Sequence, residues 1–391
     1  MTRVPALGLL LALAAVSGAQ ASGRWPVVAA KSAIVIDATT GKVLWSKDAD
    51  TQRYPASTTK IMTSLILLEN KDPDDLITAP FDVTKVGGSS LHLRPGESLT
   101  AHDALYAMML RSANDVCHSI AVQLAGSEIS FANLMNERAI EIGCTNTSFH
   151  NPNGLPNSQH KTTARDLALI AREAMRNETF REVVKTQKYW LNRSINQQDR
   201  LVINRNKWLL KDTTADGIKT GFTNDAGHTY VGSAVRNGFR VITVVLNTKT
   251  WEADHKALLD WSFANYAIGL RKNEGEPIGT LPVVNGSDAT VSVAAKGDTQ
   301  ILQRNGALQP LQITWAAGDE PSAPIRAGQD LGFAIVKDAD GFSVRVPVQA
   351  LSTVPRASLF STSTFANPTW YIVAGAMLCG AWVMRRRTRT A

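Results

Sequence analysis

The chain has 391 residues, of which 44% are hydrophobic and 19% are charged, and its formal net charge is +7. This composition is typical of a globular protein and excludes a disordered or fibrous chain. The positive charge does not indicate a nucleic-acid partner, because four arginines stand in the short tail 385–391 and the other basic residues are scattered.

The first predicted element is a signal peptide at residues 1–21. Arg3 precedes an apolar stretch from Ala6 to Val16, and a small-residue Ala-Gln-Ala pattern follows at the end of the segment. This order of charge, apolar run and cleavage pattern is typical of secretion signals. We therefore expect an exported protein whose mature chain begins near Ser22. A buried amino-terminal helix is the alternative.

Ser57 and Lys60 form an S-x-x-K motif at the start of a helix predicted from Pro55 to about Glu69. A spacing of three residues is about one helical turn, so both side chains project from one face and can form a hydrogen bond. A serine hydroxyl is inert at its own pKa and needs an adjacent base to become a nucleophile. Ser57 is therefore the candidate nucleophile and Lys60 its candidate base.

Two further motifs follow, an S-x-N motif at Ser112 and Asn114 and a K-T-G motif at residues 219–221. The first adds a hydroxyl and an amide. The second adds an amine and a hydroxyl, beside a glycine that lets a ligand approach the backbone. S-x-x-K and S-x-N are common by chance, K-T-G is rarer, and three unrelated fragments are the alternative. Their order and local context favour one serine-lysine active site.

Strand patterns at both ends of a helical segment predict the architecture of the first domain, residues 22–272. Apolar residues recur with helical spacing in the middle of this domain. The expected helices are His102–Leu110, Asp115–Leu124, Ile129–Ile142, Thr163–Met175 and a closing helix Glu252–Ala267. The expected strands are Ala33–Ile36, Val43–Trp45, Tyr230–Val235 and Val241–Leu246. We predict an α+β fold, an antiparallel sheet with an inserted helical subdomain and the active site in the cleft between them.

A second, small all-β domain is predicted at residues 273–357. Short runs of Val, Ile and Thr alternate there with Gly, Asp and Asn, and nothing has the spacing of a catalytic or metal site. Residues 358–368 are rich in Ser and Thr and are expected to form a linker.

Residues 369–384 are predicted to be a transmembrane anchor. They carry no charge, and the arginines of the tail 385–391 favour the cytoplasmic side of a membrane. The helix would rise about 24 Å, short of a hydrocarbon core of roughly 30 Å, so local thinning or snorkelling arginines would close the gap. A helix lying in the membrane surface is the alternative. We expect an anchor in the cytoplasmic (inner) membrane, with membrane lipid as a partner and the catalytic domain on the outer, periplasmic side.

The cysteines, Thr59 and the histidines are expected to have structural and not catalytic roles. Cys117 and Cys144 could form a disulfide in an oxidising compartment, but Cys117 is more typical of a buried thiol. Thr59 is expected on a helix surface, and His150 and His160 in loops. The seven histidines contain no H-E-x-x-H pair, which argues against a zinc peptidase.

With their surroundings, the three motifs resemble those of the type-5 low-molecular-mass penicillin-binding proteins, which are exported D-alanyl-D-alanine carboxypeptidases. The likeness covers nearly the whole chain. It includes further signatures at Gly88-Ser89-Ser90-Leu91, Arg94-Pro95-Gly96-Glu97, Asn204-Arg205-Asn206 and Gly221-Phe222-Thr223. The resemblance implies a serine peptidase that removes the terminal D-alanine from peptidoglycan pentapeptide stems, is acylated by β-lactam antibiotics and uses no cofactor.

The resemblance also implies the roles of the reacting groups. Ser57 would attack the carbonyl of the penultimate D-alanine, and Lys60 would take the proton of its hydroxyl. Lys60 must then be neutral, and burial and the nearby charge of Lys219 would lower its pKa. Ser112 would relay a proton to the departing amine.

A second set of residues would bind substrate. Asn114 would hold a backbone amide of the peptide, and the K-T-G residues Lys219, Thr220 and Gly221 would meet the terminal carboxylate. The oxyanion would be stabilised by the backbone N–H groups of Ser57 and Phe222. Arg205 either contacts substrate or only braces Lys219 or the sheet. The sequence departs from some relatives at Phe222 and at Asn153, where those relatives have a polar residue and a histidine.

Three other functions share part of this pattern. A class A β-lactamase would have the motifs, but it needs a glutamate for the deacylating water and needs neither the β domain nor the anchor. A DD-endopeptidase that cuts peptidoglycan cross-links would use the same catalytic residues. A non-catalytic, membrane-tethered wall-binding protein would be expected to have lost at least one of them.

Overall fold

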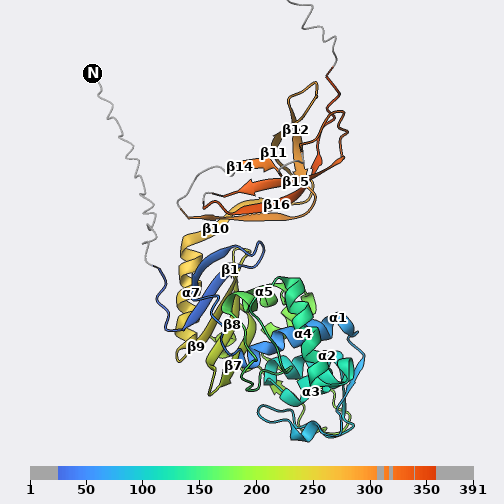
Figure 1. Ribbon diagram of the computed structural model, residues 1–391, viewed down its shortest axis with the longest axis vertical. Helices are drawn as coiled ribbons and strands as arrows, with labels where there is room; N and C mark the ends of the chain where they lie inside the picture. The colour runs from blue at the N-terminus through green and yellow to red at the C-terminus, as the bar shows by residue number, and fades with distance from the viewer. Residues whose placement is uncertain (1–24, 306–311, 317–319, 339, 358–391) are drawn as a thin grey trace, which may run out of the picture. The chain divides into compact units, whose positions relative to one another are not determined.

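The computed structural model describes residues 25–305, 312–316, 320–338 and 340–357 (Figure 1). The chain passes from one compact unit to a second after Ala267. The predicted signal peptide, linker, membrane anchor and basic tail lie outside the described residues. Within these residues, no helix is long and apolar enough to cross a membrane.

The first unit is built on a five-stranded antiparallel sheet with strand order β2-β1-β9-β8-β7. These strands are β1 (Ser32–Asp37), β2 (Val43–Lys47), β7 (Ala215–Thr223), β8 (Gly227–Arg236) and β9 (Phe239–Thr248). All six residues of β1 are buried, because helices cover both faces of the sheet. Strand β7 lies at one edge, where β8 is its only strand neighbour in the described sheet. The predicted hairpin and antiparallel sheet are confirmed.

The helices lie between β2 and β7, except for one that follows β9. They are α1 (Lys60–Asn70), α2 (Ala101–Tyr106), α3 (Asn114–Ala125), α4 (Glu128–Ile142), α5 (Ala164–Ala174), α6 (Glu178–Lys185) and α7 (Trp251–Asn265). Figure 1 shows α7 on one side of the sheet and α1 to α5 on the other. The inserted helical subdomain is therefore confirmed. The sequence did not predict α6.

Short turns and strand pairs connect these elements. The 3-10 turns are η1 (Ala56–Thr59), η2 (Val83–Lys85) and η4 (Lys207–Leu210), and the π-helical turn η3 (Ala107–Arg111) continues α2. The strand pairs are β3 (Leu76–Thr78) with β4 (Ser98–Thr100), and β5 (Lys188–Trp190) with β6 (Leu201–Ile203).

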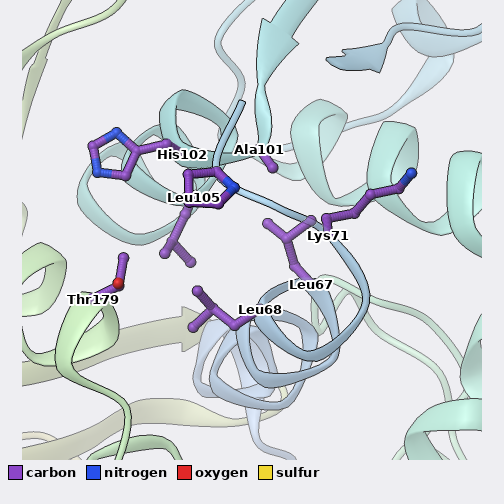
Figure 2. A pocket seen from close by; sticks show the side chains of 8 residues that line it. Leu67, Leu68, Lys71, Ala101, His102, Leu105 and Thr179 are labelled. Carbon is purple, nitrogen blue, oxygen red and sulfur yellow. The ribbon is translucent and has the colours of Figure 1, made fainter. Parts of the chain in front are cut away.

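Helix α1 is the centre of the helical core. Its first eight residues are all buried, because other helices surround it. A small pocket of about 20 Å³ remains where α1 approaches α2, with Leu67, Leu68 and Leu105 in its lining (Figure 2). This volume is about that of one water molecule, so α1 and α2 pack closely here.

The closing helix of the first unit is shorter than predicted. The sequence pattern placed its end at Ala267, but α7 ends at Asn265. Tyr266 has extended backbone angles and begins β10 (Tyr266–Lys272). Its buried ring packs against Trp261 of α7, and the strand that it begins pairs with β13, a pairing between distant segments that a helix could not make.

The second unit is a small all-β domain, as predicted. Its five-stranded sheet has the order β11-β12-β16-β15-β14, and β10 pairs separately with β13. The strands are β11 (Pro277–Pro282), β12 (Thr290–Ala295), β13 (Thr299–Arg304), β14 (Gln312–Trp315), β15 (Asp330–Lys337) and β16 (Ser343–Ala350). Val293, Ala334 and Val348 contribute to a core of its own.

Candidate active site

Ser57 and Lys60 stand where a 3-10 turn runs directly into α1. Ser57 is the second residue of η1, and Lys60 is the first residue of α1. Lys60 Nζ lies 3.1 Å from Ser57 Oγ, so the predicted contact between nucleophile and base is present. The Ser57 side chain is partly exposed, whereas Lys60 is fully buried.

The amine of Lys60 has two further partners. It donates to Asn114 Oδ1 and to the backbone oxygen of Asn153, both at 2.7 Å. These oxygens only accept hydrogen bonds, whereas the Ser57 hydroxyl can also donate one. A neutral amine fits this arrangement, with its two N–H groups on the two acceptors and its lone pair toward Ser57.

Burial lowers the pKa of Lys60 to about 8. The charge of Arg205 lowers the pKa further, while Cys117 and Asp115 act in the opposite direction. The predicted effect of burial is therefore confirmed, and Arg205 is a cation that the sequence analysis did not name for this effect, beside Lys219, whose own pKa is lowered by the charge of Lys60. A lysine with this pKa is neutral in a useful fraction of molecules near neutral pH.

The S-x-N motif lies beside Lys60 as predicted. Asn114 begins α3, and its Nδ2 donates to the backbone oxygen of Gly87 at 2.8 Å, which fixes the orientation of its amide. Ser112 ends the π-helical turn in a left-handed conformation with φ of 64°. Such a conformation costs free energy for a non-glycine residue, and it is found where a site requires a particular side-chain direction.

The K-T-G motif lies on β7. Lys219 is buried, and its Nζ donates to the backbone oxygen of Thr220 at 3.1 Å. Burial lowers the pKa of Lys219 well below its usual value, and the charges of Lys60 and Arg205 add to this effect. The amines of Lys60 and Lys219 and the guanidinium of Arg205 are therefore close enough for their charges to affect one another.

Packing within the protein itself requires Gly221, and the predicted approach of a ligand to its backbone stays a prediction. A Cβ atom at Gly221 would lie 2.4 Å from Thr229 Oγ1 and 2.9 Å from the backbone nitrogen of Ser57. The close approach is made by the protein itself, and it brings β7 against the turn that carries the nucleophile. Phe222 follows with an exposed side chain beside the ring of His228.

These elements enclose a cavity of about 480 Å³. Hydroxyl groups, charged groups and aromatic rings share its lining. The lining residues are Ser57, Ser89, Ser112, Arg205, Lys207, Thr220, Gly221, Phe222, His228, Trp251 and Glu252. Lys60, Asn114 and Lys219 are buried and do not belong to this lining. Arg205 does more than brace the sheet, because it faces the cavity and donates to Ser89 Oγ at 2.5 Å.

His160 was not predicted to belong to this site. Its Nε2 lies 2.9 Å from Thr59 Oγ1, and both residues are buried, so the prediction of a surface threonine was wrong. His160 Nδ1 accepts from the backbone N–H of His150, which leaves the ring proton on Nε2 to be donated to Thr59. Burial lowers the pKa of His160 to about 3, so the ring stays neutral.

The loop before His160 is fastened to the catalytic turn at further points. Besides the bond from Lys60 to Asn153, Thr63 Oγ1 donates to the backbone oxygen of Pro152 at 2.5 Å. A Cβ atom at Gly154 would lie 1.8 Å from the backbone oxygen of Ala56. Lys60 contacts the backbone oxygen of Asn153 and not its side chain. The asparagine that stands here in place of the histidine of some relatives therefore leaves the contact with Lys60 intact.

The described residues hold no cluster of His, Cys, Asp or Glu that could bind a metal ion. Cys117 and Cys144 are both buried free thiols, and burial raises each pKa to about 12. The option of a disulfide between them is thereby excluded.

Solved structures with this fold identify the class of protein. Penicillin-binding protein 5 from Haemophilus influenzae matches with a TM-score of 0.70 and 26% identity, over 85% of this chain and 99% of that one. A mutant of the Streptomyces K15 DD-transpeptidase matches with a TM-score of 0.58 and 32% identity, over 61% of this chain and all of that one. With the serine-lysine site, the fold defines a serine hydrolase of the penicillin-binding class.

Sequence comparison is more specific. The D-alanyl-D-alanine carboxypeptidase family model matches residues 19–250, and the model of the penicillin-binding protein 5 C-terminal domain matches residues 272–356. The carboxypeptidase DacF of Bacillus subtilis is 30% identical over 341 residues, 85% of this chain and 87% of that protein. DacA of Escherichia coli K12 is 31% identical over 352 residues, 86% of each chain. The chain belongs to the D-alanyl-D-alanine carboxypeptidase family.

Proposed function

We propose that the protein removes the terminal D-alanine from peptidoglycan pentapeptide stems through an acyl-enzyme on Ser57. The observation that carries this proposal is the hydrogen-bond arrangement of Lys60. Two of its partners are oxygens that only accept, its nitrogen lies 3.1 Å from Ser57 Oγ, and its pKa is about 8, so a neutral amine can accept the hydroxyl proton. This combination supplies a nucleophile with an adjacent base at neutral pH.

The reaction then has two stages. In the first, Ser57 Oγ forms a bond to the carbonyl carbon of the penultimate D-alanine while Lys60 accepts the hydroxyl proton. Ser112 passes its proton to the peptide nitrogen as the C–N bond breaks and receives the proton held by Lys60, so D-alanine leaves and Lys60 is neutral again. In the second, water attacks the ester, Lys60 accepts a proton from the water, and this proton goes to Ser57 Oγ as the ester bond breaks.

The oxyanion hole is assigned to the backbone N–H groups of Ser57 and Phe222. Support comes from Gly221, whose missing Cβ leaves the Ser57 nitrogen close to the neighbouring residue on β7. Preorganised N–H groups stabilise the negative charge that develops on the carbonyl oxygen during attack. The exposed edge of β7 suits an extended peptide that adds as a further strand.

The terminal carboxylate is assigned to the end of the cavity lined by Thr220 and Arg205. Lys219 is buried next to Thr220, to whose backbone oxygen its Nζ donates, and a carboxylate bound there would favour the protonated form of its amine. Asn114 is assigned to a backbone amide of the substrate as well as to Lys60, because an amide oxygen has two lone pairs.

The products decide between the candidate activities. Mass spectrometry of a synthetic pentapeptide after incubation should show loss of one D-alanine, and a cross-linked dimer should report any endopeptidase activity.

A labelled penicillin tests the nucleophile. It should form a covalent adduct on the peptide that contains Ser57, and no adduct should form with Ser57→Ala. An adduct that persists in Ser57→Ala would overturn the assignment. Absence of any product or adduct would favour a non-catalytic wall-binding protein.

The proposed location follows from the two ends of the sequence. We infer that residues 1–21 direct export and that residues 369–384 anchor the protein in the cytoplasmic membrane, with the catalytic unit on the outer side. The support is the order of charged and apolar residues. Carbonate extraction tests it, because a spanning helix resists extraction and a helix in the membrane surface does not.

A further inference from the structure

One end of the cavity has more positive charge than a D-alanine leaving group needs. Arg205 and Lys207 both line it, while Asn206 between them is buried. A departing D-alanine brings one carboxylate, which the proposed function assigns to Arg205 and Thr220. Lys207 remains, and among the described residues it has no ion-pair partner.

The position of Lys207 is fixed by packing around Tyr230. The Tyr230 hydroxyl lies 3.2 Å from Asn206 Oδ1, which also accepts from the backbone N–H of Trp208 at 3.2 Å. This bond fixes the start of η4, where Lys207 lies. The ring of Trp251 packs on Tyr230 with 4.4 Å between ring centroids. Lys207 and Trp251 therefore come from different elements but are held at the same end of the cavity.

The acidic residue of this end does not cancel the charge of Lys207. Glu252 is paired with Lys211, whose Nζ lies 2.5 Å from Glu252 Oε2. The pair is neutral as a whole, so Arg205 and Lys207 provide the net positive charge.

This end lies on the leaving-group side of Ser57. On β7, Thr220 is opposite Tyr230 and Phe222 is opposite His228, with Gly221 between them beside Ser57. The residues packed around Tyr230 are therefore on the Thr220 side of the nucleophile. That is the side to which the proposed function assigns the carboxylate of the departing residue.

We propose that Lys207 and Trp251 form a subsite for a leaving group that carries a second carboxylate. Lys207 pairs with that carboxylate, and Trp251 packs against the methylene groups that carry it. The ligand class is an acidic D-amino acid, or the acidic acceptor peptide of a cross-link, joined through its amine to the penultimate D-alanine. The subsite rests on the proposed function, and the bond changes are the same: the ester to Ser57 forms, the C–N bond breaks and the amine leaves with a proton.

Three acylated dipeptides test this subsite, with D-alanine followed by D-alanine, D-glutamate or D-glutamine. D-glutamate and D-glutamine have nearly the same shape and differ in the second charge. The wild-type protein should show a kcat/KM about fivefold higher for D-glutamate than for D-glutamine, the usual size of a partly exposed ion pair. Lys207→Gln should abolish this preference, and higher salt should weaken it in the wild type.

Lys249→Gln is the matched control, because Lys249 is exposed, close to Trp251 in sequence and outside the cavity lining. It should leave the D-glutamate preference unchanged. Equal rates for the two peptides in the wild type, or a preference that survives in Lys207→Gln, would overturn the subsite while leaving the carboxypeptidase function in place. Failure to release D-alanine from the first peptide would overturn the proposed function, and the subsite with it.

Discussion

At the scale of single residues, the proposed reaction depends on a lysine whose amine is buried but can still accept the proton of the Ser57 hydroxyl. Lys60 is fully buried, and burial is the largest cause of its low pKa. Its oxygen partners, Asn114 and Asn153, are neutral, so no carboxylate contacts the amine to hold its proton. The neutral form therefore becomes accessible near neutral pH.

The first prediction concerns pH. The rate of acylation by a penicillin should rise about tenfold per pH unit below about pH 8 and level off above it, because Lys60 must be neutral. Arg205→Gln should move the inflection to higher pH, since the guanidinium lowers the Lys60 pKa. Second-order acylation rates between pH 5.5 and 9.5 measure this. A flat profile would show that Lys60 is not the base.

The lowered pKa of Lys60 also affects the free energy of unfolding. The folded-state pKa of Lys60, about 8, lies below the unfolded value of 10.5. The unfolded chain therefore binds more protons between these two values. The contribution of Lys60 to the free energy of unfolding should rise with pH through this window and be smallest below about pH 8.

The second prediction concerns the terminal carboxylate. Lys219→Gln should cost roughly 2–5 kcal/mol of transition-state stabilisation on a pentapeptide, because it removes one partner of a buried charge pair. Arg205→Gln should also lower kcat/KM, and Lys249→Gln should not. Steady-state kinetics of D-alanine release measure all three. An unchanged kcat/KM in Lys219→Gln, with a loss in Arg205→Gln, would assign the carboxylate to Arg205 alone.

At the scale of elements, the site is assembled by contacts between β7, the catalytic turn η1 and the loop from Pro152 to His160. Gly221 lets β7 approach Ser57, and Gly154 lets the loop approach Ala56. His160 connects the far end of the loop to Thr59. The geometry of Ser57 and Lys60 is thus fixed from both sides of the turn.

Gly221→Ala should separate β7 from the catalytic turn. The added methyl group cannot fit beside Thr229 and the Ser57 nitrogen, so we expect a loss of about 1–3 kcal/mol in the free energy of unfolding together with slower acylation. The control is Gly297→Ala in the second unit, because a Cβ atom there meets nothing within 4 Å. Denaturant titration and penicillin acylation measure the two effects. Normal acylation in Gly221→Ala would show that the close approach is dispensable.

His160→Leu should loosen the loop. It removes the donor to Thr59 and the acceptor for the His150 N–H, so the free energy of unfolding should fall by about 1–3 kcal/mol.

The same substitution should change how the free energy of unfolding depends on acid pH. The folded pKa of about 3 lies below the unfolded 6.5, so wild-type stability falls as pH drops below 6.5, by about 2 kcal/mol for this histidine between pH 7 and 5.

Urea unfolding of both proteins at pH 7 and pH 5 tests this expectation. The leucine variant should lose less stability than the wild type on acidification. Part of the acid sensitivity should remain, because burial also lowers the pKa of His255 to about 3. An equal loss in the two proteins would mean that His160 is protonated in the folded state.

At the scale of the whole molecule, the catalytic groups all lie in the first unit, and each of the two units has its own hydrophobic core. The described residues that line the cavity lie between Ser57 and Glu252, within the first unit. Peptidase chemistry and attachment to a membrane are therefore expected to be separable.

Truncation after residue 357 should give a protein that still hydrolyses a pentapeptide. In cells it should move from the membrane to the soluble exported fraction, because the apolar segment 369–384 is then missing. Fractionation and product analysis measure the two outcomes. Loss of activity on the soluble peptide would mean that the removed segment supports the fold.

The sequence by itself predicted Ser57 with Lys60 as nucleophile and base, the main strands and most of the helices of the first unit, and the family. These features depend on residues close together in the chain, such as Ser57 with Lys60, or on apolar periodicity. The tertiary structure alone decided that Arg205 also lowers the Lys60 pKa, that His160 holds Thr59 and that packing of β7 requires Gly221. Thr59 and His160 are 101 residues apart, so no local pattern connects them. Burial and electrostatic reach arise only when distant segments pack together.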